Sequence, residues 1–112
     1  MNWRERTSAI GAESWSAIVD GVPFPLDAAI SDSTDDQRAC LVVDKRGDVT
    51  GHLLLVKPGG QGNLIDISDW TPVEFGMAVA ALPLKLSDQL CTLFNEVHRR
   101  LRLKEELSYA IN

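Results

Sequence analysis

The sequence predicts an α+β fold: a single domain over residues 1–112, with a small antiparallel sheet of about three strands or more. The sheet is expected to pack with an N-terminal helix and one or two C-terminal helices. Three observations predict this class. Near the N-terminus, apolar residues recur at helical spacing. Short apolar runs separated by turn residues follow, and apolar residues at helical spacing return in the C-terminal third. A length of 112 residues and a hydrophobic content of 45% suit one domain with its own core.

The N-terminal helix is predicted from apolar residues that recur at positions i, i+3, i+4 and i+7, namely Trp15, Ile18, Val19 and Val22. Gly21 would cap this helix at its C-terminus, because glycine adopts the left-handed conformation without steric cost. Two prolines at alternate positions, within residues 22–26, then require an extended path.

Two apolar runs, residues 39–43 and 52–56, predict a β-hairpin because a polar stretch with a turn at residues 45–48 separates them. A loop rich in proline and glycine at residues 57–63 ends the second strand. Residues 64–67 then predict a third strand, which completes an antiparallel meander. The second strand is apolar on both faces, so we expect another helix or a dimer mate to cover the face that the first helix layer leaves open.

A helix after residue 70 is predicted by a capping box in which Thr71 is the N-cap, proline follows at the first helical position and Glu74 is the third residue. The helix would run to about residue 81 and end before Pro83. Residues 76–81 stay open between helix and strand, because Gly76 weakens the helical pattern.

The last helix is predicted over about residues 88–107, with Ser87 as its N-cap. Its apolar face is formed by residues at helical spacing, namely Leu90, Leu93, Phe94, Val97 and Leu101. At about 20 residues it would be about 30 Å long, which is enough to span the domain.

Charge and cysteine content limit the compartment and the partners. The net charge of −5 disfavours general nucleic-acid binding, because an acidic surface repels phosphate. The longest apolar stretch, residues 76–84, is too short for a membrane span, and the N-terminus lacks the pattern of a secretory signal. Two cysteines, Cys40 and Cys91, are too few for a disulfide framework. We therefore expect a cytoplasmic protein with reduced thiols and no membrane partner.

The residue types that carry chemistry do not form a recognisable catalytic pattern. His98 and Cys91 share a helix face but are about 10.5 Å apart along the axis, too far to bind one ion. A dyad of Cys40 and His52 across the hairpin is less favoured than a core role for the cysteine. We therefore expect no enzyme activity, no cofactor and no metal site.

Two charged segments are candidate binding sites. Residues 31–37 form an acidic run whose carboxylates, Asp32, Asp35 and Asp36, would suit a basic partner surface. Residues 98–104 form a basic run with Arg99, Arg100, Arg102 and Lys104. These side chains would either complement the helix dipole, form salt bridges at an interface, or contact nucleic acid.

Taken in chain order, these segments resemble a class I effector chaperone of type III secretion systems. Residues 21–27 (Gly-Val-Pro-Phe-Pro-Leu-Asp) are similar to the family's Gly-Leu-Pro…Leu-Asp segment before the sheet, and residues 40–44 to its first core strand. Residues 81–84 (Ala-Leu-Pro-Leu), followed by the predicted helix over residues 88–107, are similar to its Leu-Pro-Leu and closing helix. The resemblance covers about residues 8–107.

The resemblance implies a homodimer without catalytic groups that holds an extended segment of a partner protein. Such a protein offers a free sheet edge and apolar side chains to the segment. The candidate contacts are Trp15, Ile18, Leu53 and Leu55. The first alternative is a small acidic inhibitor or immunity protein of phage or plasmid type that masks a partner's surface. The second is a nucleic-acid-associated regulator that uses the basic run.

Overall fold

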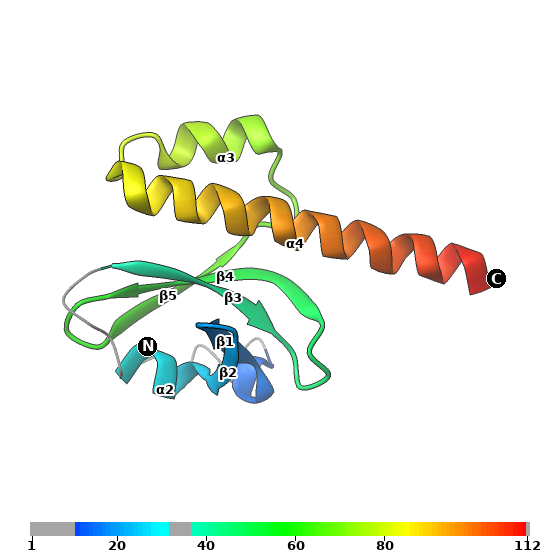
Figure 1. Cartoon of the computed structure of the whole chain (residues 1–112), viewed down its shortest axis with the longest axis horizontal. Coiled ribbons are helices and arrows are strands. Elements are labelled where there is room, and N and C mark those ends of the chain that lie inside the picture. The colour runs from blue at the N-terminus through cyan, green and yellow to red at the C-terminus, as the bar shows by residue number, and fades with distance from the viewer. Residues whose placement is uncertain (1–10, 32–36, 112) are drawn as a thin grey trace.

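The computed structural model describes residues 11–31 and 37–111 and confirms the α+β class. Its five-stranded antiparallel sheet has the order β2-β1-β3-β4-β5 and carries helices on both faces (Figure 1). The elements are η1 (Ala12–Ser14), β1 (Ser16–Val19), β2 (Val22–Pro25), α2 (Leu26–Ser31), β3 (Arg38–Val43), β4 (Val49–Lys57), β5 (Gln61–Asp66), α3 (Pro72–Val79) and α4 (Leu84–Ile111).

The helix predicted from Trp15 to Val22 is wrong, because these residues form most of a β-hairpin. Asp20 and Gly21 have φ angles of 51° and 80°, so both are left-handed, as a two-residue type I′ turn requires. The turn pairs Val19 with Val22, and β1 also pairs with β3. Branched residues favour strands, and the prolines of β2 hold it extended. The helix near the N-terminus is α2, which begins directly after the hairpin.

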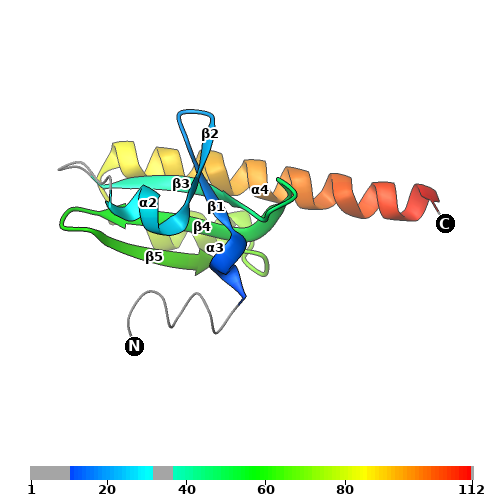
Figure 2. The same cartoon turned by 90° about the horizontal axis from the view of Figure 1, so that it is seen from below.

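The predicted meander is confirmed in β3, β4 and β5. The turn between β3 and β4 is held by Asp44, whose Oδ1 accepts the backbone N–H groups of Arg46 and Asp48 at 2.8 and 3.1 Å. β5 begins three residues earlier than predicted, directly after the turn that follows β4. The β1–β2 hairpin extends the meander beside β3, and in Figure 2 it crosses the other strands.

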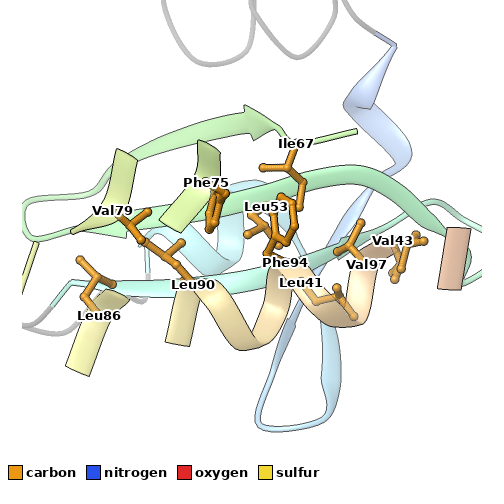
Figure 3. Close-up of a cluster of buried hydrophobic side chains, with 12 residues drawn as sticks. Leu41, Val43, Leu53, Ile67, Phe75, Val79, Leu86, Leu90, Phe94 and Val97 are labelled. Carbon is orange, nitrogen blue, oxygen red and sulfur yellow. The ribbon is translucent and has the colours of Figure 1, made fainter. Parts of the chain in front are cut away.

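Helices cover β4 on both faces, so no dimer mate is needed to shield its apolar residues. The face toward α3 and α4 buries the cluster in Figure 3, where Leu53 lies beneath Phe94 and Phe75. The opposite face packs against α2 and η1, and this second cluster consists of Ala12, Ala17, Leu26, Ala29, Ile30, Cys40, Val42, Leu54 and Val56.

The capping box of α3 is confirmed. Thr71 Oγ1 accepts the Glu74 N–H at 3.2 Å, and Glu74 Oε1 accepts the Thr71 N–H at 3.3 Å. The helix continues through Gly76 and ends at Val79, so this part of the open segment is helix, not strand.

α4 begins at Leu84, and the prediction of Ser87 as its N-cap is wrong. The Ser87 N–H donates to Pro83 O at 3.0 Å, and its hydroxyl donates to Leu84 O at 3.0 Å, so Ser87 lies inside the first turn. The 28 residues of α4 make it about 42 Å long. Its C-terminal part extends past the sheet (Figure 1).

We predict that Phe94→Ala lowers the free energy of unfolding by about 3–5 kcal/mol. The Phe94 ring is buried and lies 4.5 Å from the Phe75 ring and 4.3 Å from the His98 ring, so its removal leaves a cavity. Urea unfolding measures the change. Leu107→Ala, at an exposed position of α4, is the control and should cost less than about 0.5 kcal/mol. Equal losses for the two variants would contradict the assignment of Phe94 to the core.

Candidate functional site

The apolar residues expected to contact a partner do not form one surface. Leu53 is fully buried, and Ile18 and Leu55 are partly buried in the same cluster beneath α4. Trp15 lies on the opposite face, where its ring is 5.0 Å from the ring of His52. In this conformation Leu53 stabilises the core and has no exposed surface to offer a partner.

The acidic candidates Asp32, Asp35 and Asp36 lie outside the described residues. The basic candidates on α4 are largely compensated. Glu96 lies 2.7 Å from both Arg99 and Arg100, and Lys104 Nζ lies 3.9 Å from Asp48. The two guanidinium groups donate to Glu96 and lower the pKa of its carboxyl to about 2. Arg102 is exposed.

The cysteine and histidine of the less favoured dyad, Cys40 and His52, are placed apart in the register. Cys40 lies opposite Leu54, whereas His52 lies opposite Asp66 on the other neighbouring strand. Burial raises the pKa of the Cys40 thiol, which favours the unreactive protonated form. His52 Nε2 is 4.0 Å from Asp66 Oδ2, and its Nδ1 is buried without a hydrogen-bond partner.

His98 has a structural contact, because its Nε2 donates to Ile67 O at 2.8 Å and thereby joins α4 to the segment after β5. Within residues 11–31 and 37–111, no three histidine, cysteine or acidic side chains are grouped so that they could hold a metal ion. No helix in the described part of the chain is long and apolar enough to cross a membrane.

Three apolar side chains on α3 and at the start of α4 are exposed, and we call them the α3 ridge: Val73, Met77 and Leu84. Their exposed fractions are 72%, 75% and 75%. Val73 and Met77 are one helical turn apart on α3, while Phe75 and Val79 of the same helix are buried. A helix that is apolar on both faces normally has a partner on each. The α3 ridge is therefore a candidate protein-binding surface.

The sequence carried a signal for the α3 ridge that the element predictions did not use. Residues 70–84 contain one charged residue, Glu74. A helix with one buried face normally has charged residues on its exposed face, and this segment has almost none. Which apolar residues would face outward depended on the packing of α3 against α4.

A second candidate site is a cavity of about 340 Å³ between the β1–β2 hairpin, α2 and the start of β3. We call it the hairpin pocket. Its apolar wall consists of Val19, Val22, Phe24, Ala28 and Ala29, and its polar groups are Asp20 and Arg38. Val22 and Phe24 are 50% and 41% exposed at its rim.

Arg38 is the unusual residue of the hairpin pocket. Its Nη2 donates to Ala29 O at 3.3 Å, but its Nε is buried and has no hydrogen-bond partner. No described carboxylate lies within ion-pair distance of its guanidinium group. A buried donor without an acceptor costs about 1–3 kcal/mol, so the site favours an occupant that supplies one.

The two edges of the sheet differ in what they offer to an extended chain. Along β2, the backbone N–H and C=O groups of successive residues point alternately toward β1 and toward the open edge. Pro23 and Pro25 are two residues apart, so their backbone groups point in the same direction. The two-residue turn makes Val19 and Val22 a bonded pair, so the backbone groups of both prolines point toward the open edge. The outer edge of β2 therefore lacks these two N–H donors. β5, at the other edge, contains no proline.

No model of a known protein family, no curated protein sequence and no solved structure matches this chain. Fold and site therefore define a class in physical terms only: a small α+β protein with an exposed apolar ridge and a pocket that contains a half-buried arginine.

We predict that Glu96→Gln reduces the acid dependence of stability. The folded-state pKa of about 2 is below the ordinary value of 4.5, so the stabilisation is present above pH 4.5 and lost as the pH falls toward 2. Near neutral pH the two proteins should differ by less than about 1 kcal/mol, because the ion pairs lie at the surface.

Urea unfolding at a series of pH values measures this difference. Glu105→Gln, at an exposed position of the same helix, is the matched control and should retain the full acid dependence. Parallel pH curves for the parent protein and Glu96→Gln would show that the pair with Arg99 and Arg100 does not stabilise the fold.

Proposed function

We propose that this chain is a non-enzymatic protein-binding protein that holds a segment of a partner, as class I type III secretion effector chaperones do. One observation carries the binding of a second protein chain: the three side chains of the α3 ridge are about three-quarters exposed although the fold buries a full core elsewhere. Their burial in a complex would remove apolar area from water, at about 25 cal/mol for each Å².

The chemistry of the ridge favours a protein over a nucleic acid. Residues 70–84 include no lysine or arginine, and the whole chain has a net charge of −5. Binding to phosphate would require cations at the contact. Aliphatic side chains and a methionine instead suit the apolar side chains of another protein chain.

The resemblance to the chaperones implies two further properties, a cytoplasmic location and a homodimer. We assign the α3 ridge to the contact between the two copies. The extended segment of the partner would pair with β5, because the outer edge of that strand keeps its N–H donors whereas β2 has two prolines.

The oligomeric state tests the α3 ridge. We expect light scattering at micromolar concentration to give twice the chain mass of 12.3 kDa for the parent protein. The double variant Val73→Glu/Met77→Glu should be a monomer with the circular dichroism spectrum of the parent protein, because both positions are exposed and glutamate is a good helix former. Leu107→Glu is the matched control, an exposed apolar residue near the far end of α4, and it should stay a dimer. A monomeric parent protein would contradict the chaperone-like assembly.

Photo-crosslinking in the native host tests the partner. A crosslinking residue along the outer edge of β5, at Asn63, should capture a partner protein, whereas the same residue at Lys45 in the β3–β4 turn should not. An acidic inhibitor would release its target at high salt, because exposed charge pairs are screened. We expect the captured complex to survive high salt before crosslinking, and its complete loss there would favour the inhibitor instead.

A further inference from the structure

The hairpin pocket has three features that complement the C-terminal residue of a protein chain. Its wall is apolar, Arg38 supplies a cation with a free buried donor, and Asp20 lines the same cavity. We infer that the pocket binds the C-terminal residue of a partner protein that ends in an aliphatic side chain. This inference rests on the proposed function for the source of the ligand, since it names the chemistry of the bound partner.

The size and wall of the cavity suit one such residue. A volume of about 340 Å³ is at the lower end of the range for ligand sites. α2 contributes Ala28 and Ala29 to the wall, and because both side chains are short they leave space that Val22 and Phe24 border from β2. An aliphatic side chain would fill that space and cover the exposed surface of the rim.

Arg38 selects the carboxylate. The contact of its Nη2 with Ala29 O holds the guanidinium group at the end of α2 while Nε stays without an acceptor. A carboxylate is the acceptor that matches a guanidinium in charge and in geometry. A neutral carbonyl would satisfy the donor but leave the half-buried guanidinium charge without an anionic partner among the described residues.

Asp20 complements the other end of the ligand residue. It lies in the hairpin turn, and its carboxylate can accept the backbone N–H of the bound residue. An amino-acid residue at a chain end presents an N–H, a side chain and a carboxylate from a single Cα. The pocket has an acceptor, an apolar wall and a cationic donor for these three groups.

The test uses small probes that isolate each group. N-acetylleucine has the N–H, the side chain and the terminal carboxylate, and N-acetylleucinamide replaces the carboxylate by a neutral amide. Backbone amide shifts are followed by two-dimensional NMR during titration with each probe. We expect saturable shifts for N-acetylleucine at residues 19–22, 24 and 28–29, and binding at least about tenfold weaker for the amide.

Two variants and a control test the residues. Arg38→Gln should weaken N-acetylleucine binding at least about tenfold, because it removes the charge. Ala28→Leu should abolish binding, because the larger side chain fills the cavity from an exposed position of α2. This variant keeps Arg38, so its result is independent of any effect of Arg38→Gln on folding. Arg102→Gln, an exposed arginine on α4, should bind as the parent protein does.

Any one of four results would overturn the inference. Equal affinity for the acid and the amide would remove the role of the carboxylate. Tighter binding of free leucine than of N-acetylleucine would assign the pocket to a small metabolite and not to a protein end. Absence of saturable shifts, or an equal effect of Arg102→Gln, would mean that the pocket does not bind the probe specifically.

These results are separate from those for the proposed function. A dimer with a captured partner but no probe binding would leave the proposed function standing and remove the pocket. Specific probe binding by a monomer without a partner would do the reverse, and the carboxylate site would remain without the chaperone-like assembly.

Discussion

The fold depends on the burial of β4 from both sides. Leu53 faces α3 and α4, whereas Leu54 and Val56 face α2, and none of the three is exposed. Antiparallel sheets commonly leave one face in water, but this strand has no polar face to expose. Cover is therefore required on both sides, and the chain supplies it from elements that precede and follow the meander. The arrangement of α2, α3 and α4 follows from this one requirement.

The two covers differ in size, and the candidate sites arise from that difference. α4 lies along the sheet with large side chains such as Leu90 and Phe94. α2 has six residues and fits closely where Ile30 meets Gly62, since an added Cβ at that glycine would lie 2.7 Å from Ile30 Cδ1. Beyond that contact the alanines of α2 leave the hairpin pocket open. On the other side, α3 packs on α4 with one face and leaves the α3 ridge in solvent.

Local signals predicted the part of the fold that local interactions determine. The strands β3, β4 and β5 and the Thr71 capping box each involve residues close in sequence, and their existence was predicted. The segment from Trp15 to Val22 is compatible with either a helix or a strand. Its apolar spacing matches one face of a helix, but its branched residues also favour a strand. Gly21 is left-handed in both a helix cap and a type I′ turn. The conformation of Asp20 and the pairing of β1 with β3 decide between them, and neither is visible in the sequence.

The candidate sites were less predictable than the fold, because they depend on tertiary placement. The hairpin pocket brings residues 19–24, 28–29 and Arg38 together only after the hairpin has folded against α2. The prediction of a helix over Trp15 to Val22 could not indicate it. The compensation of Arg99 and Arg100 by Glu96 follows helical spacing and could have been anticipated from α4 alone. Leu53 was expected to contact a partner, and its burial depends on the placement of α3 and α4 over β4, which the sequence does not show.

The length of α4 has a consequence for how the molecule opens. The helix passes the end of the sheet (Figure 1). The side chains of residues 102–107 are all exposed. Their backbone hydrogen bonds are supported by the helix itself and by little tertiary packing. Local fraying there has a much lower free energy than opening at Phe94, so amide hydrogens in the overhanging turns exchange without global unfolding. A protease would shorten the chain at this end while the sheet and its two covers stay folded.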